Sequence, residues 1–93
     1  MDYSKNRILL IDDEPGWCKL LKSGLQESGL EVEYETEAEN ALNVIDTFEP
    51  HAVVLDVIFG KVRKGKSTFK DITERHPGLT VIMLTYTVTE KDF

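Results

Sequence analysis

The sequence predicts a single α/β domain in which a parallel sheet is covered by helices on both faces. Short apolar runs with the length of strands alternate along the chain with segments of helical spacing. Two of these runs, over residues 8–11 and 53–55, are apolar throughout, which is typical of strands buried on both faces of a parallel sheet. The 93 residues, of which 41% are hydrophobic, are enough for one such domain and too few for two.

The first strand is predicted over residues 6–11, and a helix is predicted to follow it from Pro15. Apolar residues recur along this helix at helical spacing, and Gly29 is its expected stop. These residues are Trp17, Leu20, Leu21, Gly24 and Leu25. Residues 30–35 alternate apolar side chains with glutamates. This pattern predicts a half-buried strand at a sheet edge, because the charges oppose pairing with another chain.

A second helix is predicted to start at a capping box formed by Thr36 and Glu39 and to end before Pro50. Residues 52–59 form the most apolar stretch of the chain, which predicts a strand at the centre of the sheet.

The last third of the sequence continues the alternation. A loop is predicted over residues 60–65, and a third helix over residues 67–76, before Pro77 and Gly78. Residues 80–85 are predicted to form a fourth strand, and residues 87–93 the first turn of a further helix.

The polarity of the strands indicates their order in the sheet. Strands that alternate with helices of this length form βαβ units with right-handed crossovers. The apolar third strand and the half-polar second strand indicate the order 2-1-3-4, a flavodoxin-like doubly wound parallel sheet. In such sheets ligands bind at the carboxyl ends of the strands where the winding reverses, here between the first and third strands.

Carboxylates follow both strands that flank this point. Asp12 and Asp13 come directly after the first strand, and Asp56 ends the core of the third. At a spacing of about 4 Å two such groups repel by roughly 4 kcal/mol at an effective dielectric near 20, so a cation is expected to neutralise them. Oxygen ligands favour Mg²⁺. The acids predict a metal-assisted phosphate site, with a helix N-terminal cap as the alternative role for Asp12 and Asp13.

The composition argues against several function classes. A net charge of -6 and a pI near 4.8 disfavour direct binding to nucleic acid, which needs clustered Lys and Arg. Cys18 is the single cysteine, so it forms no internal disulfide; we expect it to be buried, in a reducing cytoplasmic setting. The first residues lack the apolar stretch of a signal peptide, and no run approaches the roughly 18 apolar residues of a membrane span, so no membrane association is expected.

Three motifs, taken together, resemble those of the receiver domain of two-component response regulators. They are the acidic pair Asp12-Asp13, the acid Asp56 and the hydroxyl of Thr85, which close the first, third and fourth strands. The resemblance covers essentially the whole chain. It implies a cytoplasmic phosphorelay protein that is not an enzyme and that receives a phosphoryl group from a sensor histidine kinase or a phosphotransfer protein.

The resemblance also implies roles for individual residues. Asp56 would be the phosphoacceptor. Asp13 and Asp56 would bind Mg²⁺ directly and Asp12 through water, and the backbone carbonyl of Ile58 would supply a further ligand. Thr85 would hydrogen-bond a phosphoryl oxygen and so couple phosphorylation to the loop behind it; an ordinary strand-end hydroxyl is the alternative.

The sequence departs from the family pattern at its end. Receiver domains have five βα units, and this sequence stops after the fourth strand, so residues 1–93 are expected to form one truncated receiver domain that lacks the fifth unit. The lysine that follows the family's fifth strand has no counterpart, and Tyr86 replaces a residue that is usually small. The fourth strand would then be an apolar edge, and the first helix would lose cover near Trp17. Such edges pair readily, which predicts a homodimer or a strand-completing partner.

Two other functions are weighed against the phosphoacceptor. A receiver-like interaction or dimerisation module that acts independently of phosphorylation agrees with the missing lysine and the bare edge. A phosphohydrolase with an aspartate nucleophile needs a second acid two residues after the nucleophile, where this chain has Ile58. The phosphoacceptor is therefore the favoured function and the interaction module the alternative.

Overall fold

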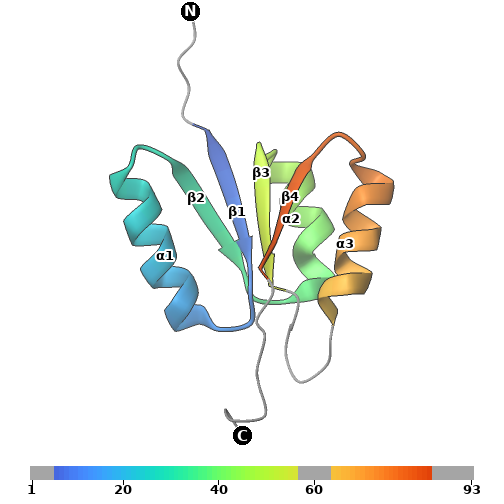
Figure 1. Cartoon of the computed structure of the whole chain (residues 1–93), viewed down its shortest axis with the longest axis horizontal. Helices are drawn as coiled ribbons and strands as arrows, with labels where there is room; N and C mark the ends of the chain where they lie inside the picture. Colours follow the sequence, from blue (N-terminus) through green and yellow to red (C-terminus); the bar gives the residue numbers. More distant parts are fainter. Residues whose placement is uncertain (1–5, 57–63, 85–93) are drawn as a thin grey trace, which may run out of the picture.

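The computed structural model of the chain describes residues 6–56 and 64–84 (Figure 1). Four strands form one sheet in these residues: β1 (Arg7–Ile11), β2 (Glu31–Glu35), β3 (Ala52–Asp56) and β4 (Thr80–Leu84). The strand order is β2-β1-β3-β4, and all neighbouring strands are parallel. The predicted α/β fold class and the order 2-1-3-4 are confirmed.

Helices cover the sheet on both faces. Helix α1 (Pro15–Glu27) lies on one face, and α2 (Ala41–Phe48) and α3 (Lys64–Arg75) lie on the other (Figure 1). A short 3-10 helix, η1 (Ala38–Asn40), leads into α2. None of the helices in residues 6–56 and 64–84 has the length and apolar character that crossing a membrane requires.

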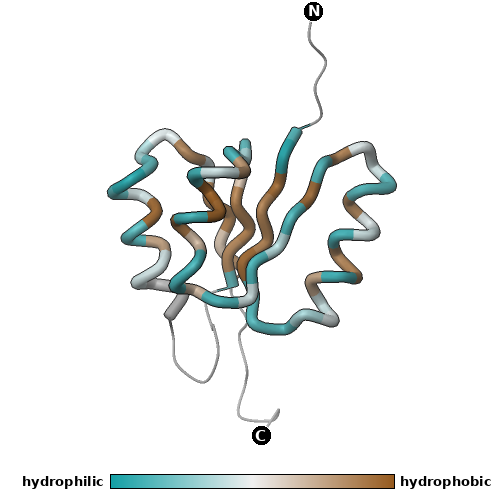
Figure 2. Tube along the Cα trace, turned by 180° about the vertical axis from the view of Figure 1, so that it is seen from behind, coloured by the Kyte–Doolittle hydropathy of each residue, from teal (hydrophilic) through white to brown (hydrophobic). Residues whose placement is uncertain are grey.

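The main core lies between the sheet and helices α2 and α3. Side chains alternate across a strand, so every second residue of β1 and β3 points to this face. The strand residues of this cluster meet one fully buried isoleucine from each helix. The cluster contains Leu9, Ile11, Ala41, Ile45, Val53, Leu55 and Ile72. Figure 2 shows hydrophobic residues along the central strands, whereas β2 alternates between hydrophobic and hydrophilic residues as an edge strand does.

The opposite face of the sheet is covered by α1 over its β2 half. Cys18 of α1, Val32 of β2 and Leu10 of β1 are buried there. The expected burial of Cys18 is confirmed. The helix stops where predicted, because Gly29 adopts the positive φ of 90° that favours glycine directly after the C-terminal cap Ser28.

The predicted capping box of Thr36 and Glu39 is wrong. The N-cap position of η1 is Glu37, and no side chain caps the helix. The backbone N–H of Glu37 instead donates to the carboxylate Oε2 of Glu35 at 2.8 Å. This local turn occupies the segment that the capping box requires, so η1 begins one residue later than Thr36 would place it.

Helix α3 begins at Lys64, three residues before the predicted start at Ser67. Gly65 therefore lies in the first turn of the helix and not in the loop. The first four backbone N–H groups of a helix have no partner within it, so a glycine in this turn costs less than one in the helix interior. Other predictions lie outside the described residues: the end of the third strand over residues 57–59, and the helical turn over residues 87–93.

Candidate functional site

The three predicted acids meet at the carboxyl edge of the sheet. Asp12 and Asp13 follow the end of β1, and Asp56 is the last residue of the neighbouring strand β3. One carboxylate oxygen from each of them lies within 4.8 Å of the others, and all three residues are half-buried. At such distances full negative charges repel by about 3–4 kcal/mol per pair at an effective dielectric near 20. The cluster is an acidic pocket whose oxygen atoms have the type and spacing that a hard divalent cation requires.

Backbone hydrogen bonds fix the position of Asp12. Its N–H donates to the carbonyl oxygen of Glu35 at the end of β2, at 3.1 Å. Its side-chain Oδ1 accepts from the N–H of Glu14 at 3.0 Å, which closes a turn between β1 and α1. The N-cap of α1 is Glu14 and has no side-chain capping bond, so neither Asp12 nor Asp13 occupies the cap that was their alternative role.

The electrostatics of the pocket oppose ionisation of Asp12. Burial raises the pKa of this carboxyl above its ordinary value, and the negative charges of Asp56 and Asp13 raise it further. The hydrogen bond from the N–H of Glu14 acts in the opposite direction. The pocket therefore concentrates negative charge at a cost that a bound cation would remove.

Cys18 lies directly behind the pocket but is not part of its chemistry. Its thiol donates to the backbone carbonyl of Asp12 at 3.5 Å. Burial raises the pKa of the Cys18 thiol to about 11, and the negative charges of Asp12 and Asp13 add to this. The side chain is therefore a protonated packing group near neutral pH, as its sequence context indicates.

Two further residues predicted for the site, Ile58 and Thr85, lie outside the described residues, as does Tyr86. Their predicted roles stay predictions. The described part of the pocket is the set of three acids, which come from two adjacent strand ends.

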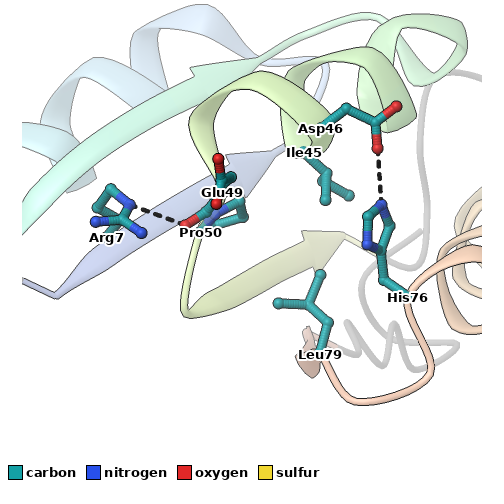
Figure 3. A pocket seen from close by; sticks show the side chains of 7 residues that line it. All are labelled: Arg7, Ile45, Asp46, Glu49, Pro50, His76 and Leu79. Carbon is teal, nitrogen blue, oxygen red and sulfur yellow. Dashed lines mark hydrogen bonds and ion pairs between the residues drawn. The ribbon is translucent and has the colours of Figure 1, made fainter.

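A second hollow lies at the opposite, amino-terminal edge of the sheet, with a cavity volume of about 430 Å³ (Figure 3). Its lining comes from the start of β1, the end of α2 and the segment between α3 and β4. The residues are Arg7, Ile45, Asp46, Glu49, Pro50, His76 and Leu79. None of the acids at positions 12, 13 and 56 takes part, so this hollow is separate from the acidic pocket.

Asp46 joins two helices beside this hollow. Its Oδ2 accepts from Nη2 of Arg75 at 2.5 Å, and its Oδ1 lies 2.9 Å from Nε2 of His76 (Figure 3). The hydrogen bond from Arg75 is the main reason why the pKa of Asp46 lies below its ordinary value, and His76 contributes in the same direction. Sequence reasoning missed this network, because its partners are 29 and 30 residues apart and have no motif in common.

The lowered pKa gives Asp46 a testable pH dependence. A carboxyl whose folded pKa lies below its unfolded value of about 3.8 stabilises the fold above that pH, and the stabilisation is lost as the pH falls through the folded pKa. Asp46→Asn is therefore expected to lower the free energy of unfolding at pH 6, with a deficit that shrinks toward pH 3. Urea titrations at both pH values measure it.

Asp71→Asn is the matched control for this test. Asp71 is exposed on α3 and takes part in no ion pair among the described residues. The control is expected to leave the free energy of unfolding unchanged at both pH values. An equal deficit for Asp46→Asn at pH 3 and pH 6 would contradict the role of the Asp46 charge.

Comparison with known proteins decides the family. The model of the response regulator receiver domain family matches residues 8–93. The chain belongs to the response regulator receiver domain family. The fold class, the strand order and the position of the acidic pocket of this receiver domain all agree with that membership.

Curated relatives of the receiver domain are longer proteins. The chain is 36% identical over 87 residues to the transcriptional regulatory protein CpxR of Escherichia coli K12. This alignment covers 94% of the chain and 36% of that protein. It is 33% identical over 79 residues to the alkaline phosphatase synthesis transcriptional regulatory protein PhoP of Bacillus subtilis 168, covering 85% of the chain and 32% of that protein. The chain thus spans about a third of the length of these relatives.

Solved structures of receiver domains share the fold. A CheY-like response regulator receiver domain from Methanospirillum hungatei JF-1 has a TM-score of 0.82 and 25% identity, with 96% of this chain and 70% of that chain covered. The BeF3-activated receiver domain of RstA from Klebsiella pneumoniae has a TM-score of 0.78 and 25% identity, with 94% of this chain and 73% of that chain covered.

Proposed function

We propose that this receiver domain is a phosphoacceptor that takes a phosphoryl group on Asp56 with the help of Mg²⁺ and thereby switches an output or a partner. The observation that carries the proposal is the convergence of Asp12, Asp13 and Asp56 within 4.8 Å. Response regulator homologues suggest a sensor histidine kinase or a phosphotransfer protein as the donor.

In the phosphoryl transfer, Asp56 is the one residue of the protein that would form a covalent bond. A carboxylate oxygen of Asp56 attacks the phosphorus and forms an acyl phosphate, while the bond to the donor breaks and its electron pair leaves with the donor atom. Such a reaction depends on positioning and charge neutralisation. Mg²⁺, when bound, supplies the positive charge that offsets the repulsion between the carboxylate and the incoming phosphate.

The chain's own residues do the positioning. The parallel pairing of β1 with β3 aligns the two strand ends, so Asp56 lies beside the acidic pair. The backbone N–H and the side chain of Asp12 both take part in hydrogen bonds with the backbone of neighbouring segments. These bonds hold the turn that carries the acidic pair in place without a bound ligand. Asp12, Asp13 and Asp56 would hold the cation, with the carbonyl of Ile58 as a further ligand and the hydroxyl of Thr85 as a donor to the phosphoryl group.

A related protein supplies further support. The RstA receiver domain from Klebsiella pneumoniae was solved in a BeF3-activated form. Beryllofluoride is a chemical mimic of a phosphoryl group, so a BeF3-activated relative agrees with the phosphoryl adduct that we propose for Asp56.

Phosphoryl incorporation from a small acyl phosphate tests the proposal. The chain is incubated with acetyl phosphate and MgCl₂ and analysed by intact-mass spectrometry, with EDTA in a parallel sample. We expect a mass increase of one phosphoryl group per chain with MgCl₂, and none with EDTA. Circular dichroism of the same samples confirms that the chain is folded; a folded chain without the adduct in MgCl₂ would refute the phosphoacceptor function.

A further inference from the structure

The hollow at the amino-terminal edge of the sheet has the size and the lining of a small-molecule site. Its volume of about 430 Å³ lies within the range of roughly 300–1,000 Å³ that ligand pockets occupy. Ile45, Pro50 and Leu79 supply apolar walls, and polar side chains lie on either side of Ile45 (Figure 3). Apolar walls with a few polar groups are typical of sites for small ligands.

Arg7 is held firmly at this hollow, with part of its guanidinium group left over. Its backbone N–H donates to Nδ1 of His51 at 2.8 Å, and its backbone carbonyl accepts from the N–H of His51 at 2.7 Å. Its Nε donates to the backbone carbonyl of Glu49 at 2.8 Å. The terminal Nη atoms take part in no hydrogen bond or ion pair within residues 6–56 and 64–84. They form a fork of donors of the kind that binds a carboxylate.

Glu49 brings a negative charge close to this guanidinium group without pairing with it. Glu49 directly follows α2, and its φ of 51° lies in the left-handed region that favours glycine. It is the one non-glycine residue with a positive φ in the described parts of the chain. Its side chain is exposed and forms no ion pair with Arg7 or with any other described residue. A glutamate where glycine would be less strained indicates a role for its side chain.

The charge of the other acid at the hollow is already matched. Asp46 accepts a hydrogen bond from Nη2 of Arg75 and lies 2.9 Å from Nε2 of His76. Arg7 and Glu49 therefore provide the two charges of the lining that have no ionic partner among the residues described. Opposite charges on neighbouring residues, next to apolar walls, suit a ligand that carries both charges close together on an apolar body.

We propose that the hollow binds a free α-amino acid with an aliphatic side chain. The Nη atoms of Arg7 would hold its carboxylate and Glu49 its ammonium group, with its side chain against the apolar walls. A simple carboxylate or a simple amine matches one of these two charges, whereas an α-amino acid matches both. The hollow and the acidic pocket lie at opposite edges of the sheet, so this binding requires neither Mg²⁺ nor phosphorylation of Asp56.

Titration of the isotope-labelled chain with L-leucine, followed by NMR in the absence of Mg²⁺, tests the proposal. We expect saturable shifts of the backbone amide signals of Ile45 and Leu79. Isocaproate and isoamylamine carry the same aliphatic group with one charge each, and glycine carries both charges without the aliphatic group. Each of the three is expected to bind about tenfold or more weakly than leucine, because each loses one set of contacts.

Two variants test the two charged residues separately. Glu49→Gln removes the partner of the ammonium group and keeps the backbone carbonyl that holds Arg7. Arg7→Gln removes the partner of the carboxylate. Each is expected to weaken leucine binding by about tenfold or more. The matched controls Glu37→Gln and Lys70→Gln change exposed residues that do not line the hollow, and they are expected to leave the affinity unchanged.

Circular dichroism confirms that each variant is folded. A wild-type chain without saturable shifts up to the solubility limit of leucine would overturn the proposal. Equal affinities for isocaproate and leucine would also overturn it, as would a Glu49→Gln chain that binds leucine like the wild type. Asp56→Asn is expected to bind leucine normally, so a failure here is distinct from a failure of phosphoryl incorporation.

Discussion

Asp56→Asn is expected to abolish phosphoryl incorporation from acetyl phosphate in MgCl₂. The neutral amide keeps the shape of the side chain but removes the nucleophilic carboxylate and one of the three negative charges that would hold the cation. Intact-mass spectrometry measures the loss directly. The same variant is expected to weaken Mg²⁺ binding in calorimetry, because it removes one of three carboxylates that lie within 4.8 Å of one another.

Glu14→Gln provides the matched control for this prediction. Glu14 is the acid next to the pair in sequence, but it is exposed, and the cluster of three acids does not include it. Its replacement is expected to leave phosphoryl incorporation and Mg²⁺ affinity close to those of the wild type. An Asp56→Asn chain that still gains a phosphoryl group would place the acceptor at another residue.

Leu55→Ala is expected to lower the free energy of unfolding by about 2–5 kcal/mol. Leu55 has an exposed fraction of 0% and lies in the core cluster between β3 and helices α2 and α3. Its truncation removes buried apolar surface and leaves a cavity that the surrounding strands fill only in part.

Leu20→Ala makes the same chemical change at a site with an exposed fraction of 65%. It is expected to change the free energy of unfolding by no more than about 0.5 kcal/mol. Urea titrations of the two variants under identical conditions measure the contrast. Equal losses for both would mean that Leu55 does not occupy a packed core.

The sheet and the convergence of the acids follow from the sequence. The apolar runs at residues 8–11 and 53–55 predicted buried parallel strands, and the glutamates of residues 31–35 predicted an edge strand. These patterns were enough to predict the strand order 2-1-3-4 that the structure has. Because parallel strands end at the same edge, acids that follow two adjacent strands must meet. Local pattern and chain topology together therefore predicted where Asp12, Asp13 and Asp56 lie.

The sequence was a poorer guide where short-range alternatives compete. Thr36 and Glu39 have the spacing of a capping box, yet the Glu35 carboxylate bonds the N–H of Glu37 and shifts the helix start. Both arrangements use residues that lie close together in the chain. Their energies differ by no more than a hydrogen bond or two, so spacing alone does not select between them.

The sequence by itself determined the fold class, the strand order and the carboxyl-edge acidic pocket of this receiver domain, because strand periodicity and strand ends are local properties. Only the tertiary structure decided how Asp46 joins Arg75 and His76 and how the Cys18 thiol contacts the backbone carbonyl of Asp12. These features depend on distances between segments far apart in the chain. Such distances are set by packing of the whole sheet and its helices, and no run of neighbouring residues encodes them.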